Sequence, residues 1–205
     1  MTEEVTLAGD KMLMVEHDDG SVSISFDDKG TGRSCGKCSL CCKLLPIPVP
    51  LNKPAGSRCQ FQKASKGCSI YPRRPMACKT WSCRWLSDPL AQGLKRPDRT
   101  HYVVDFSYGT ATSTNEQTGV STPVSMLQVW VDPAFRDAHR DPDLRTYLAM
   151  MAEKWQVGAI IRYGTQEAFL LLAPALTDGT WVERRDEFYP WSDQMPAQLN
   201  RVQPA

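Results

Sequence analysis

The positions of the cysteines constrain this chain more than any other feature of its sequence. All eight lie between Cys35 and Cys83, and the rest of the 205-residue chain contains none. Cysteines that only fill an apolar core need no such clustering, because each acts as a small buried hydrophobe. We therefore expect one cysteine module that binds metal, with these candidate ligands: Cys35, Cys38, Cys41, Cys42, Cys59, Cys68, Cys78 and Cys83.

The first half of the module has the sequence Cys35-Gly-Lys-Cys38-Ser-Leu-Cys41-Cys42. Two residues between thiolates allow a tight turn to direct both sulfurs at one ion, as in thiolate zinc sites. Neighbouring side chains diverge, so Cys42 is expected to serve a second centre or to bridge. The spacing of the later cysteines does not divide the eight ligands between centres. Two four-coordinate centres and one polynuclear site both remain open.

The metal also remains open between zinc and an iron–sulfur cluster. Bacterial ferredoxins use three cysteines at this interval to hold a four-iron cluster, which favours iron–sulfur. The proline that follows the fourth ferredoxin cysteine is absent, because Lys43 follows Cys42. An all-cysteine zinc site is compatible with the same ligands.

Charge separates the cysteine region from the rest of the chain. No Asp or Glu occurs from Lys29 to Ser87, although the chain as a whole has a net charge of +1. Metal centres with four thiolates carry negative charge, and nearby cations favour thiolate over thiol. The basic residues of this stretch are Lys29, Arg33, Lys37, Lys43, Lys53, Arg58, Lys63, Lys66, Arg73, Arg74, Lys79 and Arg84.

The cellular compartment of the protein affects whether clustered cysteines are expected to form disulfides or to bind metal. Residues 1–10 carry Glu3 and Glu4 and lack the basic start and apolar run of a secretory signal. We therefore expect a cytoplasmic protein, in which clustered thiols bind metal more often than they form disulfides. The sequence has no apolar stretch of the length of a membrane-spanning helix, so no membrane is expected as a partner.

The CxxCxxCC run, Cys59, Cys68 and the element Tyr71-Pro-Arg-Arg74-Pro75-Met-Ala-Cys78 together resemble the YkgJ-type cysteine-cluster family. That family is described as a zinc- or iron-chelating domain. The resemblance covers residues 35–83, and implies that all eight cysteines are ligands and that Tyr71, Arg74 and Pro75 belong to the frame of the site. It also implies a bacterial cytoplasmic protein without an assigned reaction.

Outside the module, the sequence predicts an α+β fold. Strands with alternating apolar residues are expected at 11–15 and 21–26 as a hairpin, and at 101–108, 125–131, 157–161 and 168–172. A helix is expected to begin at Asp141-Pro142, with Leu144, Tyr147, Leu148, Met151 and Trp155 on one apolar face. The predicted divisions are a hairpin at 1–30, an irregular metal-stapled module at 31–95, a C-terminal antiparallel sheet with one or two helices at 96–191, and a loose tail at 192–205.

Three classes of function fit this pattern. A closed shell of thiolates has no open position for a substrate, which favours a structural metal module that is presented to a protein partner. An iron–sulfur enzyme or redox accessory protein is the first alternative, although no catalytic residue is apparent and His17, His101 and His139 lie too far apart to suggest ligands. The second alternative is nucleic-acid binding by the basic module, with Tyr71, Trp81 and Trp85 as stacking groups. The two tryptophans flank Cys83, where they either shield a metal centre from water or are ordinary core residues.

Overall fold

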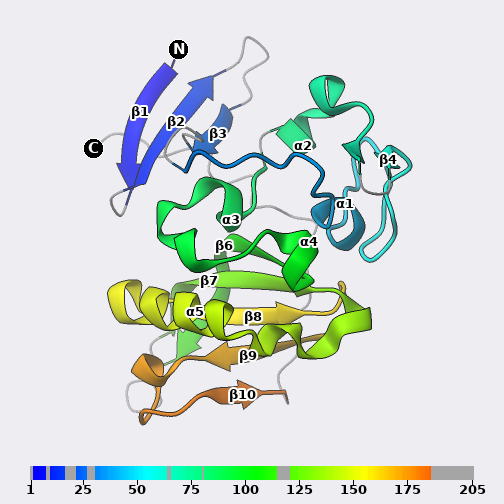
Figure 1. The fold of residues 1–205 in the computed structure, drawn as a ribbon. Coiled ribbons are helices and arrows are strands. Elements are labelled where there is room, and N and C mark those ends of the chain that lie inside the picture. Colours follow the sequence, from blue (N-terminus) through cyan, green and yellow to red (C-terminus); the bar gives the residue numbers. More distant parts are fainter. Residues whose placement is uncertain are drawn as a thin grey trace.

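The computed structural model describes residues 2–7, 10–16, 22–26, 31–63, 66–79, 81–114 and 121–185. The fold is α+β, as predicted: a five-stranded sheet carries one long helix on one face, and the cysteine region lies against the edge strand β6 and the other face (Figure 1). None of the helices in these ranges is long and apolar enough to cross a membrane.

The five-stranded sheet has the order β10-β9-β8-β7-β6. Its strands are β6 (Tyr102–Thr114), β7 (Ser121–Val131), β8 (Gly158–Arg162), β9 (Ala168–Leu172) and β10 (Val182–Arg184). The prediction of an antiparallel sheet is wrong at one pair, because β7 and β8 run parallel. The chain leaves β7, crosses the sheet through a helix and returns in the same direction, which is the connection that parallel strands require.

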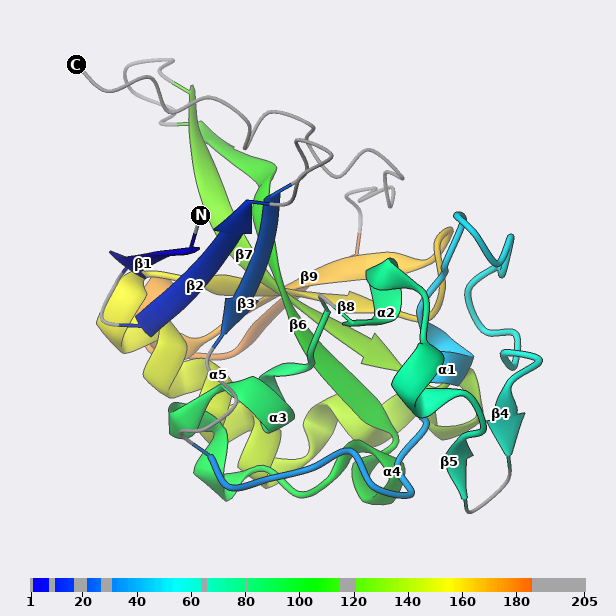
Figure 2. The same ribbon diagram turned by 90° about the horizontal axis from the view of Figure 1, so that it is seen from above.

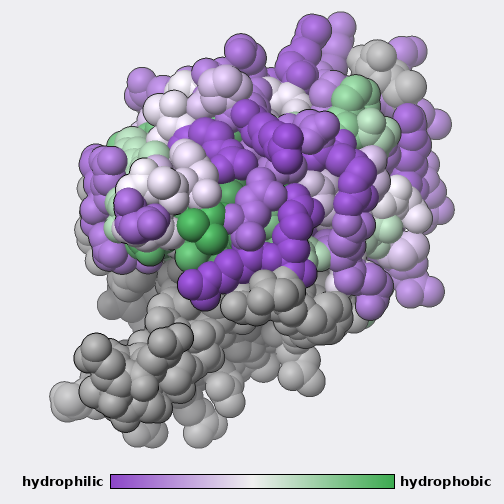
Figure 3. All heavy atoms as spheres, turned by 90° about the horizontal axis from the view of Figure 1, so that it is seen from below, coloured by the Kyte–Doolittle hydropathy of each residue, from purple (hydrophilic) through white to green (hydrophobic). Residues whose placement is uncertain are grey.

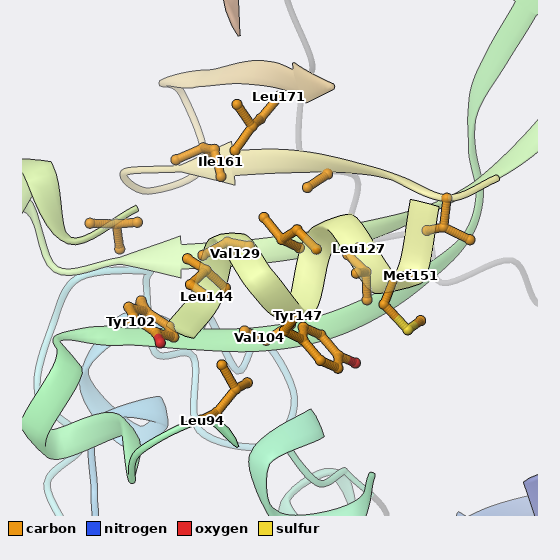
Figure 4. Packing of buried hydrophobic residues seen from close by; sticks show 14 of the residues in the cluster. Leu94, Tyr102, Val104, Leu127, Val129, Leu144, Tyr147, Met151, Ile161 and Leu171 are labelled. Carbon is orange, nitrogen blue, oxygen red and sulfur yellow. The ribbon is translucent and has the colours of Figure 1, made fainter. Parts of the chain in front are cut away.

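That crossover helix is α5 (Pro142–Trp155), and its start and buried face agree with the prediction. The Asp141 side chain caps the helix by accepting hydrogen bonds from the N–H groups of Asp143, at 2.8 Å, and Leu144, at 3.3 Å. Pro142 occupies the first helical position, where no N–H is needed. Leu144, Tyr147 and Met151 are buried against the sheet (Figure 4), and Leu148 is buried as well.

Replacing Asp141 with alanine should lower the free energy of unfolding by about 1 kcal/mol, because two N–H groups at the start of α5 lose their acceptor. Urea unfolding followed by circular dichroism measures this loss. Asp137→Ala is the matched control, since that carboxylate is exposed and caps no helix. Equal stability of the two variants would contradict the capping role.

The two faces of the sheet bury different partners, because neighbouring residues of a strand point to opposite faces. Leu127 and Val129 of β7 join the core under α5. Trp130 of the same strand and Val103 of β6 instead join a second cluster with Cys83, and this cluster also contains Leu44 and Leu86 of the cysteine region. The cysteine region is therefore anchored to the face opposite α5.

The cysteine region consists of short elements, as its prolines predicted. They are α1 (Cys41–Leu44), β4 (Gln62–Lys63), β5 (Gly67–Cys68), the 3-10 helix η2 (Tyr71–Arg73), α2 (Met76–Lys79), α3 (Arg84–Ser87), η3 (Pro89–Gly93) and α4 (Pro97–Thr100). Figure 2 shows them wrapped beside β6. An ion pair of 2.5 Å between Lys43 and Asp132 ties α1 to the end of β7.

The N-terminal residues form a separate antiparallel sheet of three strands, β1 (Thr2–Leu7), β2 (Asp10–Glu16) and β3 (Val22–Phe26). The predicted hairpin corresponds to β2 and β3, with Met12 opposite Phe26. Strand β1 was not predicted. The predicted tail at 192–205 lies outside the described residues.

Two short 3-10 helices, η4 (Pro133–Arg140) and η5 (Pro174–Leu176), complete the C-terminal half. The edge of the sheet at β10 carries paired charges: Glu183 lies 2.7 Å from Arg185 and 3.5 Å from Arg145. Seen from this edge, hydrophilic side chains dominate the surface (Figure 3). Charged side chains on an edge strand discourage pairing with another chain.

Candidate metal centre

The first cysteines are placed by a tight turn and by the helix α1 that follows it. The N–H of Cys38 donates to the carbonyl oxygen of Cys35 at 2.8 Å, which closes the turn between them. Cys41 and Cys42 are the first two residues of α1. The hairpin of β4 and β5 lies directly against this turn, since a Cβ added at Gly67 would stand 2.6 Å from the carbonyl oxygen of Gly36.

Backbone contacts connect Cys59 and Cys68 with Cys42 of α1. The N–H of Cys59 donates to the carbonyl oxygen of Cys42 at 3.0 Å, and the N–H of Gln62 donates to that of Cys59 at 2.9 Å. Gln62 then pairs with Cys68 across β4 and β5. These contacts connect three cysteines that are separated by up to 26 positions along the sequence.

The element between Tyr71 and Cys78 approaches from η2 and α2. The Arg74 guanidinium lies 3.7 Å from the centre of the Tyr71 ring, and its Nε donates to the Tyr71 carbonyl at 3.1 Å. The N–H of Cys78 donates to the carbonyl oxygen of Pro75 at 2.9 Å. These contacts connect Tyr71, Arg74 and Pro75 with the backbone that leads to Cys78.

Cys83 differs from the other cysteines because it is buried in the interface with the sheet. Its exposed fraction is 7%, and it packs with Val103 and Trp130. Cys35 and Cys41 are partly buried against the same cluster. Trp81 and Trp85 are also partly buried against it.

The buried thiols are poor acids in this setting. Burial raises the pKa of Cys83 to about 12, and Cys35 and Cys38 add to the rise. The pKa of Cys41 is raised well above its usual value by a hydrogen bond to Cys42, by burial and by the nearby thiols of Cys83 and Cys35. A thiol in such a site becomes a thiolate when a cation compensates its charge, which a bound metal does.

Opposing effects act on the pKa of Cys38. Burial raises its pKa, while the backbone N–H groups of Leu40 and Asp98 hydrogen-bond to the sulfur and oppose the rise. Such N–H groups are the usual partners of metal-bound sulfurs, whose properties they adjust.

Positive charge acts on the thiols of Cys42 and Cys78. The pKa of Cys42 is lowered to about 7, first by the hydrogen bond from Cys41 and then, against the effect of burial, by Lys53 and Arg74. The pKa of Cys78 is raised by burial and by the thiols of Cys42 and Cys59, with Arg74 opposing.

Lys53 is a buried lysine whose ammonium lies near these thiols. Its exposed fraction is 7%, and Nζ donates to the carbonyl oxygens of Lys43, Leu45 and Pro54 at 3.3, 2.5 and 3.1 Å. Burial lowers its pKa, and the thiols of Cys59 and Cys42 act in the opposite direction. None of the ion pairs found among the described residues includes Lys53. A buried cation requires compensation, and the nearby sulfurs of Cys59 and Cys42 would supply it as thiolates.

Lys53→Gln should weaken metal binding by roughly 10- to 100-fold, the range seen when an outer partner of a metal site is lost. Competition with a chromophoric zinc chelator measures the affinity. Lys37→Gln is the matched control, because Lys37 lies in the Cys35–Cys38 turn but is exposed. Similar affinities for the two variants would exclude compensation of the thiolates by Lys53.

Within the part of the chain that the structure describes, no three His, Cys, Asp or Glu side chains are already arranged to hold one metal ion. Metal binding would therefore draw the sulfurs closer together. Neither histidine with a described side chain lies among the cysteines: His101 stacks on Phe135 at 3.5 Å, and Nδ1 of the buried His139 is 2.7 Å from the Arg136 carbonyl oxygen. His17 lies outside the described residues.

The sequence did not single out Lys53, which is one of many lysines in the acid-free stretch, nor Asp105 of β6. Burial raises the pKa of Asp105 to about 6, and this carboxyl group is close enough to Cys83 to raise the pKa of its thiol. No pattern local to either residue predicts that its side chain is buried.

Comparisons of the chain with models of protein families, with curated proteins and with solved structures find no match.

Proposed function

We propose that residues 31–95 form a metal-binding module in which all eight cysteines are ligands of zinc or of iron–sulfur clusters. One observation carries this proposal: Leu44 is the single buried apolar side chain among the described residues from 31 to 79, a segment that contains seven of the eight cysteines. A segment without an apolar core needs another source of folding free energy. Bound metal supplies it in small cysteine-rich modules.

The residues present suit such a metal. Thiolates are soft ligands that select zinc or iron–sulfur clusters over calcium or magnesium. The eight cysteines are free thiols carried by short elements and by the turns between them. Lys53, Arg74 and backbone N–H groups are placed to offset negative charge on the sulfurs.

The proposed role is mainly structural, with a redox role if the metal is iron. Bound metal would supply folding free energy, and an iron–sulfur cluster would in addition accept one electron. The chain itself fixes the backbone around the sulfurs, excludes water with Trp81 and Trp85, and anchors the site to the sheet through Cys83, Leu44 and Leu86. Membership of the YkgJ-type family and a cytoplasmic location belong to the same proposal.

The double variant Cys38→Ser, Cys41→Ser tests this assignment on the full chain. Purified without air, it should contain less metal than the unchanged protein and should unfold at lower urea concentration. Ser57→Ala is the matched control, because Ser57 is exposed in the same module. If the double variant kept the full metal content and stability, the cysteines would not be ligands.

Nucleic-acid binding is a second candidate, because the module exposes cations beside an aromatic ring. Tyr71 is 41% exposed, and Lys37, Arg58, Lys63, Lys66, Arg73 and Lys79 are exposed as well. Binding of a single-stranded oligonucleotide at low salt, with affinity that falls steeply as salt rises, would support it. Absence of binding at low salt would exclude it.

A further inference from the structure

We infer that the eight cysteines form two separate four-thiolate centres, an inner one at the sheet and an outer one at the surface of the module. The inner centre consists of Cys35, Cys38, Cys41 and Cys83, and the outer centre of Cys42, Cys59, Cys68 and Cys78. This inference rests on the proposed metal binding and divides its ligands.

The inner set is defined by packing. Cys83 reaches α1 from a segment more than forty positions further along the chain, and Cys35 and Cys41 pack against the same apolar cluster as Cys83. The turn closed by the 2.8 Å hydrogen bond from Cys38 to Cys35 keeps Cys38 beside them. The charges of Cys35 and Cys38 both act on Cys83, as expected for neighbours in one site.

The outer set is defined by backbone connections. Cys59 is hydrogen-bonded to Cys42, and the β4–β5 pairing places Cys68 opposite Gln62, which is itself bonded to Cys59. Cys78 is the remaining cysteine and is absent from the apolar cluster at the sheet, so it is assigned to the outer set, in agreement with the effects of Cys42, Cys59 and Cys68 on its thiol.

Helix α1 explains why adjacent cysteines belong to different centres. Successive residues of an α-helix point about 100° apart, since each turn contains 3.6 residues. Cys41 is packed on the sheet-side cluster, whereas the charges of Lys53 and Arg74 act on Cys42; the two thiols hydrogen-bond to each other, so the two centres would adjoin at this helix. One short helix therefore supplies one ligand to each centre.

The surroundings make the two centres unequal. The inner thiols lie within a largely apolar interface, where Asp98 and Asp105 act on Cys38 and Cys83, and the cations Arg96 and Lys53 act on Cys38 and Cys41. The outer thiols have Lys53 and Arg74, and their rim contains the exposed Tyr71 and Met76. We therefore expect a chelator to remove metal from the outer centre first.

Two single variants, Cys83→Ser and Cys78→Ser, test the division in the full chain. Each should retain about half of the metal of the unchanged protein, and the variant with both changes should retain none. Loss of all metal from either single variant would indicate one shared polynuclear site and would overturn the inference. An unchanged protein that binds no metal would instead refute the proposed function itself.

A second measurement does not depend on the folding of variants. The reduced metal-free protein is titrated with zinc, and unprotected thiols are alkylated and located by mass spectrometry. Protection should arise in two groups of four, with Cys35, Cys38, Cys41 and Cys83 protected together. Groups that mix inner and outer cysteines would overturn the division even if zinc binds.

Discussion

Removing metal from the reduced protein with a chelator should unfold the cysteine module and leave the core between α5 and the sheet intact. The module buries almost no apolar side chains of its own between residues 31 and 79, whereas the α5 face buries Leu127, Val129, Leu144 and Phe169. Structural zinc contributes about 10–16 kcal/mol in small zinc modules, so its loss exceeds what the rest of the module can supply.

Hydrogen exchange shows which part of the chain unfolds when the metal is removed. The amides of Cys59 and Lys53, bonded to Cys42 and Ile47, should lose protection after chelation. The amide of Ile160, in the interior strand β8, should keep its protection. Added zinc should restore protection if zinc is the native metal. Exchange that chelation leaves unchanged throughout the module would contradict the structural role of the metal.

Arg84→Met should lower the free energy of unfolding by about 3–5 kcal/mol, because it leaves a buried carboxylate without its cation. Asp88 is 1% exposed and accepts hydrogen bonds from Arg84 Nη2 at 2.8 Å, from the Tyr147 hydroxyl at 2.6 Å and from the Leu90 N–H at 2.8 Å. This network joins α3, next to Cys83, to α5. Urea unfolding of the full chain measures the loss.

Two further variants show whether the loss of stability in Arg84→Met comes from the buried ion pair. Tyr147→Phe removes one hydrogen bond to the same carboxylate and should cost less, about 1.5–3 kcal/mol. Arg99→Met is the control for loss of an arginine, because Arg99 is exposed, and it should change stability by less than about 0.5 kcal/mol. An effect of Arg84→Met as small as that of Arg99→Met would show that the buried pair does not stabilise the fold.

Sequence periodicity was sufficient to predict the helices and strands that have one buried face. The alternation in β3 and the three- and four-residue spacing in α5 predicted those elements, and the cap at Asp141 predicted where α5 begins. The parallel pairing of β7 with β8 could not be predicted in this way, because it depends on where α5 packs after leaving β7. Strand β10 has only three residues, Val182–Arg184, too few to show a period.

The candidate site was predictable in composition but not in arrangement. Clustering along the chain was enough to identify all eight cysteines as candidates. Their proposed division depends on contacts between distant segments, above all the packing of Cys83 with Val103 and Trp130, which no spacing encodes. The burial of Lys53 likewise follows from carbonyl groups that surround it only after the chain from Lys43 to Pro54 has folded.

The most direct test of metal binding is the metal and acid-labile sulfide content of the full chain purified without air, together with a count of reactive thiols. We predict bound metal and thiols that react fully only after the metal is removed. Iron with matching sulfide and a brown colour would identify iron–sulfur clusters, and zinc without sulfide would identify thiolate zinc sites. A folded protein with no metal and eight freely reactive thiols would contradict the account.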